Sequence, residues 1–346
     1  MRKSGVMRVL KVLSLLACLV APQMARAALL PPVYMDYVVA IGGIRHAPAG
    51  QPPHDEWATS GTGFLYGYCV HDDPDPAKRV YAVFLVTAKH VVNGHAGDIV
   101  VRINSNQANS FPGQFTLASR DAAGHDLWFS PSDPGIDLAL YPIPISQLKQ
   151  MGFASGFFAS DANAADSDRM KAIGVSAGDG VFVLGFPMNL GGEQKNYVIV
   201  RQGGVARISE MLDHASKTYL VDAFVFPGNS GSPVLLKPDV AAIQGTRSSP
   251  TSYLIGVVLS YRPYRDVAVS RQTGEERVMM EENSGLAEVL PTEYIDQAAR
   301  QWLAAQPAAT APAAPPPEIT PPAANPPAAL TPPATSGPAS PPTSAP

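Results

Sequence analysis

Short runs of β-branched and aromatic residues recur through the body of the chain and constrain its fold more than any other feature. Each run is rich in Val, Ile, Phe or Tyr and is bounded by Gly, Pro, Asn or Asp, the pattern of strands joined by turns. The long amphipathic helices that a βαβ sheet needs between its strands are not seen. We therefore expect an all-β fold, built as barrels or as a sandwich. The predicted strands lie near Val38–Ile41, Thr62–Tyr66, Tyr81–Thr87, Asp98–Ile103, Asp137–Pro142, Gly180–Gly185, Tyr197–Arg201, Tyr219–Phe226 and Tyr253–Leu259.

Two helices are predicted beside the strands. The segment Ser160–Ile173 holds Ala, Asp and Met and is interpreted as a helical insertion. The segment Pro291–Ala305 is expected to form a closing helix with Thr292 as N-cap, because its apolar residues fall on one helical face. That face consists of Ile295, Ala298, Ala299, Trp302 and Leu303.

The N-terminal residues 1–27 have the pattern of a secretory signal peptide. Basic residues precede an apolar run of ten residues, Val12–Ala21, and Ala25–Ala27 forms an A-x-A cleavage site. Two alternatives stay open: a lipoprotein signal, since Leu15–Cys18 loosely resembles a lipobox, and an uncleaved anchor. No other apolar stretch reaches the ~18 residues of a membrane span, so no stable membrane insertion is expected after cleavage.

Charge argues against nucleic-acid binding, and composition predicts a tail and a fold without a disulfide. Cleavage would remove five basic residues and no acidic one, leaving 20 basic against 29 acidic residues, a net charge of −9. An acidic exported protein is a poor binder of nucleic acid. Residues 306–346 are rich in Pro, Ala, Ser and Thr and are predicted to be a disordered tail. The one cysteine left after cleavage, Cys69, has no partner, so a large buried core must hold the fold.

Three segments place reactive side chains at the ends of predicted strands. His90 follows the apolar strand 84–87, Asp137 precedes the apolar Leu138–Leu140, and Ser230 lies in a glycine-flanked loop. A serine hydroxyl needs an adjacent base, histidine suits that role, and a carboxylate fixes its tautomer. Gly228 permits a backbone conformation in which the N–H groups of Gly228 and Ser230 form an oxyanion hole.

These segments resemble the trypsin-like serine peptidases, which have the chymotrypsin fold. The matching motifs are T-A-K-H at 87–90, D-L-A at 137–139 and G-N-S-G-S-P at 228–233, in the family's order. The resemblance implies two six-stranded antiparallel β-barrels (about 36–150 and 175–290) and a C-terminal helix (291–305), together a peptidase domain over 28–305. It also implies that His90 is the general base, Asp137 its orienter and Ser230 the nucleophile of an endopeptidase acting on proteins or peptides.

Several alternatives compete with this assignment. Asp126 and Asp133 compete with Asp137 as the acid, but only Asp137 is followed by a strand-compatible apolar run. An α/β-hydrolase would need G-x-S-x-G, and Ser232 occupies the last glycine position. Asn229 stands where zymogen-activated members have an acid, so an ion pair with a newly cut N-terminus is not expected. The main functional alternative is a catalytically silent domain that acts as a binding module. A weaker alternative is that the tail is the functional part and the peptidase domain is its cargo.

The resemblance also marks a substrate pocket. Phe224 would lie at its base, with Ser260 and Tyr261 along its wall, which predicts an apolar or small residue before the scissile bond. The oxygen-rich stretch His71–Asp75 is interpreted as a surface turn because it lacks EF-hand spacing. We expect neither a metal nor a cofactor.

Overall fold

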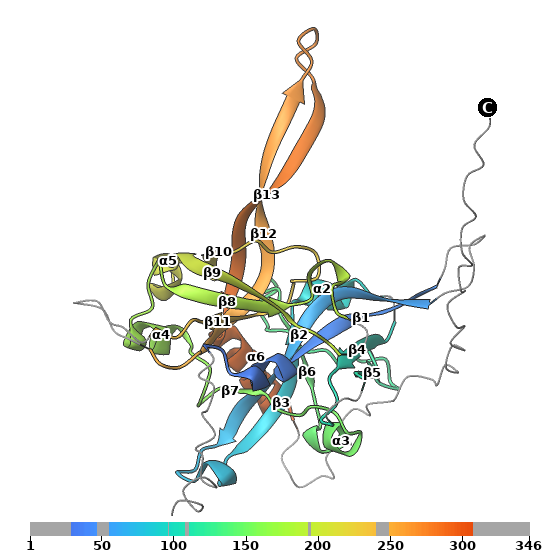
Figure 1. The fold of residues 1–346 in the computed structure, drawn as a ribbon, viewed down its shortest axis with the longest axis vertical. Coiled ribbons are helices and arrows are strands. Elements are labelled where there is room, and N and C mark those ends of the chain that lie inside the picture. Colours follow the sequence, from blue (N-terminus) through green and yellow to red (C-terminus); the bar gives the residue numbers. More distant parts are fainter. Residues whose placement is uncertain are drawn as a thin grey trace, which may run out of the picture.

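The computed structural model describes residues 29–46, 55–95, 97–107, 111–192, 195–239 and 249–306. The predicted signal peptide (1–27) and nearly all of the predicted tail (306–346) lie outside these residues. The described chain is mainly β, with two sheets, short helices and one longer C-terminal helix (Figure 1). The all-β class and the C-terminal helix are confirmed.

The N-terminal sheet has seven strands, in the order β5-β4-β1-β2-β3-β6, with β7 paired in parallel to β2. The prediction of a closed six-stranded barrel differs from this, since the described edge strands β5 and β6 are not paired. The chain between them runs as a loop, tied to β6 by the isolated bridge between Phe129 and Leu140. The strands are β1 (Val38–His46), β2 (Asp55–His71), β3 (Val80–Thr87), β4 (Ile99–Ile103), β5 (Gly113–Leu117), β6 (Ala139–Pro142) and β7 (Phe158–Ala159).

The C-terminal sheet closes into a six-stranded barrel, as predicted. Its order is β10-β13-β12-β11-β8-β9, closed by the pairing of β9 with β10. Sequence analysis found four of these strands and missed β11 and β13. The strands are β8 (Gly180–Gly185), β9 (Ile199–Arg207), β10 (Tyr219–Asp222), β11 (Pro233–Leu236), β12 (Leu254–Val269) and β13 (Glu276–Pro291).

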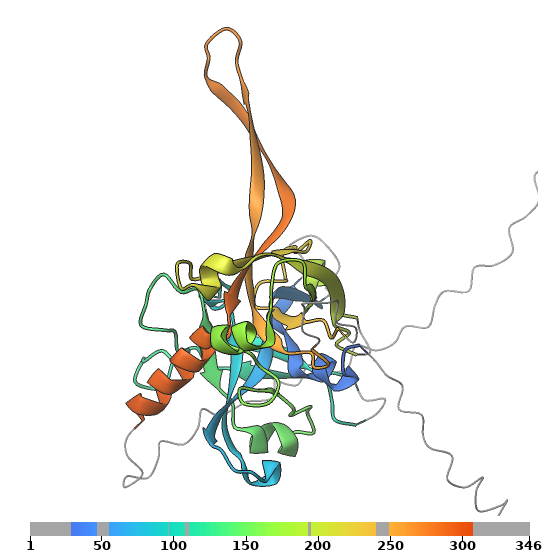
Figure 2. The same ribbon diagram turned by 90° about the vertical axis from the view of Figure 1, so that its left-hand side faces the viewer.

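Strands β12 and β13 continue beyond the barrel as a long two-stranded arm (Figures 1 and 2). Residues Leu254–Leu259 of β12 are buried in the barrel, whereas from Ser260 onward the strand is mostly exposed. The arm bears ion pairs such as Arg265 to Glu281 at 3.0 Å. Sequence analysis did not predict the arm, because mixed polar and apolar residues exposed on both faces leave no alternating pattern.

The helices are short except for the last. They are α2 (Lys89–Asn93), α3 (Ile145–Gln150), α4 (Ser167–Ile173), α5 (Ser209–Leu212) and α6 (Glu293–Ala305), with 3-10 turns at Pro32–Tyr37, Pro76–Lys78 and Pro187–Asn189. Helix α4 begins later than the predicted Ser160, because the Asp166 side chain caps it by accepting from the Arg169 N–H at 2.8 Å. Of the described helices, none has the length and apolar character to cross a membrane.

Helix α6 packs where the sequence placed its apolar face, with Ile295, Ala298 and Ala299 fully buried. They join the core of the N-terminal sheet, while the C-terminal barrel has a core of its own. Thr292 occupies the N-cap position of α6, as predicted, but its side chain makes no capping hydrogen bond. Its hydroxyl donates instead to the Ala165 carbonyl at 2.7 Å, which ties the start of α6 to the chain ahead of α4.

Candidate active site

The pairing of β3 with β6 brings His90 and Asp137 together. Thr87 is opposite Ala139 in this ladder, so the residues that follow β3 lie beside those that precede β6. The chain turns at Ala88, whose backbone is extended, and His90 follows in the first turn of α2. Buried strand residues on both sides fix this junction.

Asp137 holds His90 through two hydrogen bonds. Its Oδ2 lies 2.6 Å from His90 Nδ1, and its Oδ1 accepts from the His90 backbone N–H at 2.9 Å. Burial acts to raise the pKa of the Asp137 carboxyl, but the hydrogen bonds and charge of His90 outweigh burial, so this pKa lies below its ordinary value. An ionised carboxylate at Nδ1 keeps the proton there and leaves Nε2 as an acceptor.

The serine loop is shaped by Gly228 and Asn229. Gly228 has φ +99°, a conformation that L side chains rarely adopt, and an added Cβ would lie 2.3 Å from the Phe186 carbonyl oxygen. The buried side chain of Asn229 accepts from the Phe226 N–H at 3.0 Å and donates to Ser232 at 3.4 Å. In this structure Asn229 therefore stabilises its own loop.

Thr62 of β2 ties this loop to the N-terminal sheet. Its backbone N–H donates to the Ser230 carbonyl at 2.9 Å, and its hydroxyl donates to the Gly228 carbonyl at 2.7 Å. The same hydroxyl accepts from the Phe186 N–H at 3.1 Å. Sequence analysis placed Thr62 at the start of a predicted strand but missed this role, because its partners lie more than a hundred positions away in the chain.

The loop leaves two backbone donors free. Within the described part of the chain, the N–H groups of Gly228 and Ser230 have no hydrogen-bond acceptor. The bonds from Thr62 to both carbonyls hold the intervening peptides in place. Two fixed donors without a partner can stabilise negative charge on an oxygen.

Most of the residues selected from the sequence meet in one pocket of about 520 Å³. His90, Asp137, Gly228 and Ser230 line it, together with Ser260 and Tyr261 at the start of the arm. The Ser230 hydroxyl donates to the Leu259 carbonyl at 3.2 Å. Among the described residues, no hydrogen bond joins Ser230 to His90.

Phe224 does not lie where the sequence placed it. The segment after β10 is extended, and alternate residues Ala223 and Val225 are buried while Phe224 is 54% exposed. Its ring lies over Gly285 of β13, outside the pocket lining. Val225 lines the pocket instead, and it follows Phe224 directly.

The competing acids have other partners. Asp126 binds Arg120 at 3.0 Å, and Asp133 binds Lys217 at 2.5 Å. Sequence analysis did not select Ser60, which lines the pocket and is hydrogen-bonded to His95 at 2.8 Å. Burial lowers the pKa of His95, which favours its neutral form.

One cluster has metal-ligating residue types. The ligand atoms of Cys69, Asp72 and Asp161 lie within 4.8 Å of one another. Arg79 already forms an ion pair with each carboxylate, at 3.2 Å from Asp72 and 2.6 Å from Asp161. Burial raises the pKa of the Cys69 thiol, which disfavours the thiolate that a metal requires.

Comparison with known proteins agrees with this geometry. A search of curated proteins gave no match. The family model of the trypsin-like peptidase domain matches residues 61–239, just over half of the chain. The matched segment begins at the Thr62 strand and includes His90, Asp137 and Ser230. This chain belongs to the trypsin-like peptidase domain family.

Proposed function

We propose that the protein is an exported serine endopeptidase with Ser230 as nucleophile, His90 as general base and Asp137 as orienter. One observation carries the proposal. Three segments far apart in sequence bring these side chains into one pocket, with Asp137 bound to both the backbone and the ring of His90. Family membership supports peptidase chemistry as the class of reaction.

In the proposed reaction, Ser230 Oγ attacks the carbonyl carbon of the scissile bond and its proton passes to His90 Nε2. The N–H groups of Gly228 and Ser230 bind the resulting oxyanion. The intermediate then collapses, the C–N bond breaks, and His90 gives its proton to the leaving amine. Water then attacks the acyl carbon while His90 takes its proton. The second intermediate collapses, the ester bond to Ser230 Oγ breaks, and His90 returns the proton to Ser230 as the acid is released.

The Ser230 hydroxyl must turn from the Leu259 carbonyl toward His90 for this reaction. Rotation about one side-chain bond moves the oxygen without moving the backbone, and catalytic hydrogen bonds often tighten only when substrate binds. The bond to Leu259 also favours the alternative function, a catalytically silent binding module. In that case the cleft would bind extended peptides without cleaving them.

Labelling with a fluorophosphonate probe separates the two functions. Purified residues 28–346 should react covalently, and Ser230→Ala and His90→Ala should both abolish the reaction. The alternative predicts a folded protein that does not label. Asn93→Ala, on the same short helix as His90 but outside this pocket, is a control that should label normally.

The pocket supports a preference for an apolar or small residue before the scissile bond. Val225, Phe226 and Leu259 contribute apolar walls, and Asp137 is the one acid in the lining, engaged by His90. A Lys or Arg side chain would find no free carboxylate there. A peptide library cleaved preferentially after Lys or Arg would contradict this preference.

We propose further that the protein is exported to the periplasm or beyond the cell. The basic N-terminus, the short apolar run and the Ala25–Ala27 site support this location. N-terminal sequencing of protein recovered from the extracytoplasmic fraction should begin at Ala28. A mature chain that starts at Cys18 would identify a lipoprotein instead.

A further inference from the structure

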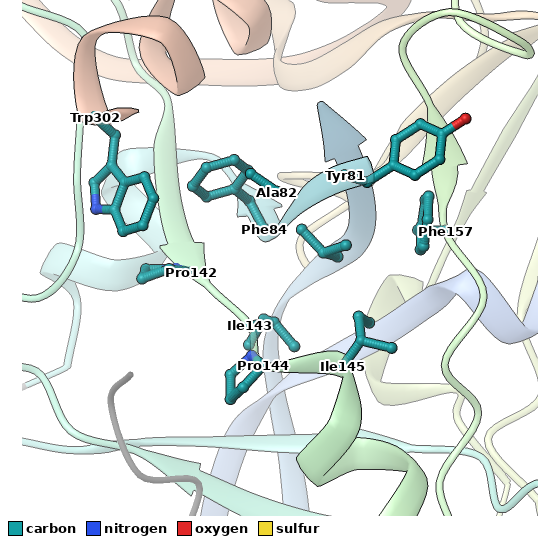
Figure 3. A pocket seen from close by; sticks show the side chains of 10 residues that line it. Tyr81, Ala82, Phe84, Pro142, Ile143, Pro144, Ile145, Phe157 and Trp302 are labelled. Atoms are coloured by element: carbon teal, nitrogen blue, oxygen red, sulfur yellow. The ribbon is translucent and has the colours of Figure 1, made fainter. Parts of the chain in front are cut away.

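An apolar groove of about 420 Å³ lies on the N-terminal sheet, beside helix α6 (Figure 3). We call it the apolar groove. Its lining comes from β3, the end of β6, the segment that leads from β6 into α3, the residue ahead of β7, and α6, and none of its lining residues is charged. It shares no residue with the active-site pocket. Its volume is within the range of ligand pockets, roughly 300–1,000 Å³.

Aromatic side chains stand on two sides of the apolar groove (Figure 3). On one side Trp302 meets Phe84 edge to face, with ring centroids 5.3 Å apart. On the other side Tyr81 meets Phe157, with centroids 5.1 Å apart. Grooves with aromatic walls are the surfaces on which proteins dock polyproline II helices, whose rings pack between aromatic side chains.

Trp302 also offers a hydrogen bond. Within the described residues, its indole N–H has no acceptor, and the indole nitrogen is not fully buried. A polyproline II chain has no internal hydrogen bonds, so its carbonyl oxygens are available as acceptors. The apolar groove and the Trp302 indole N–H therefore complement a polyproline II helix, which presents apolar rings and unpaired carbonyl oxygens.

The chain itself supplies such a segment next to the groove. Helix α6 carries Trp302 and ends at Ala305, and the side chain of Gln306 donates back to the Trp302 carbonyl at 3.4 Å. Residues 307–346 then hold 15 prolines and one charged residue, Glu318. The first proline run, 315–317, begins nine residues after Gln306, about 28 Å at the 3.1 Å rise of polyproline II. That length is ample for a return to Trp302.

We propose that the apolar groove binds the proline-rich segment of the chain's own tail, residues 307–346, as a polyproline II helix. Tethering favours this occupant, since a short linker holds a segment at an effective concentration on the order of 1 mM. Weak intrinsic affinity therefore suffices. The near absence of charge in both surfaces means that no ion has to be desolvated on docking.

The indole N–H signals of ¹⁵N-labelled residues 28–346 test the proposal. The chain has three tryptophans, and Trp302→Phe identifies the signal of Trp302. In a full-length variant, the nine prolines of runs 315–317, 321–322, 326–327 and 332–333 are replaced by serine. The Trp302 signal should shift in this variant, and the signals of Trp57 and Trp128 should stay in place as controls for folding. A peptide of residues 310–335, added at about 1 mM, should restore the original position.

Each outcome bears on the proposal. An identical Trp302 signal in the two full-length proteins would overturn it. A shift that depends on protein concentration would also overturn it, because the tail of a second copy would then occupy the groove. Restoration by a matched peptide in which serine replaces the prolines would show that the groove binds any extended chain and would refute recognition of polyproline. The readout does not require peptidase activity, so it is independent of the proposed function.

Discussion

Replacing Thr62 by valine tests how the two sheets together form the oxyanion site. Valine has nearly the shape of threonine but no hydroxyl, so the change removes the bond to the Gly228 carbonyl and the bond from the Phe186 N–H. Gly228 and Phe186 are both buried, and the Thr62 side chain that bonds them is fully buried as well. Leaving a buried polar group unpaired costs about 1–3 kcal/mol, so the two together should destabilise the fold by about 2–6 kcal/mol.

Activity should fall for a separate reason. The Thr62 hydroxyl holds the carbonyl of the Gly228–Asn229 peptide, which lies between the two free N–H donors. Without it, this peptide keeps only the bond from the Asn229 N–H to the Phe226 carbonyl, so the two donors are less firmly oriented. Loss of one oxyanion donor costs about 10²–10³ in turnover, and we expect the rate constant of fluorophosphonate labelling to fall by that order. Thr62→Ser keeps the hydroxyl and should recover most of the rate.

Urea unfolding and labelling kinetics, measured on wild type, Thr62→Val and Thr62→Ser, separate the two effects. A Thr62→Val protein with the wild-type labelling rate would refute the positioning role, even if it were less stable. A wild-type unfolding midpoint in the same variant would refute the account of the buried hydrogen bonds.

Three other predictions follow from particular residues. Gly228→Ala should lower the labelling rate at least 10²-fold, since its Cβ would lie 2.3 Å from a backbone carbonyl, whereas Gly274→Ala, also at positive φ but with open space around it, should label normally. Burial raises the pKa of Asp296, which accepts from Tyr66 at 2.7 Å, to about 6. An acid with a raised folded-state pKa favours the folded state when protonated. The free energy of unfolding should therefore decrease as the pH rises from about 4 to about 6, by about 3 kcal/mol at most. Asp296→Asn should abolish this decrease in urea titrations. Deleting Asp266–Met280 and closing the arm with Asn-Gly should change the melting temperature by less than about 4 °C, because the barrel ladder below remains paired; a larger loss would mean that the arm stabilises the barrel.

The sequence predicted the parts of the fold in which burial leaves a pattern. The apolar run before His90 and the one after Asp137 became β3 and β6, and their pairing placed the two side chains together. The face of α6 was predicted for the same reason. Strand β13 was missed because seven of its first eight residues are exposed, and charged and bulky apolar residues are mixed there without a period.

The remaining errors have local causes. The resemblance placed Phe224 at the base of the pocket, and a difference of one residue in an extended segment turns a side chain to the opposite face. The N-terminal sheet was expected to close, but closure depends on how the chain between β5 and β6 runs, which strand patterns do not determine. Thr62 acts through contacts with residues more than a hundred positions away, which no local spacing reveals.

The position of Thr62 has a consequence for when the site comes into existence. His90, Asp137 and Thr62 belong to the sheet that is synthesised first, whereas Gly228 and Ser230 come from the barrel that follows. Domains generally fold as units, the N-terminal one earlier. On the proposed mechanism, until the second barrel closes and its loop meets Thr62, the chain has the general base but no nucleophile beside it, so we expect no cleavage of the chain itself or of its neighbours at that stage.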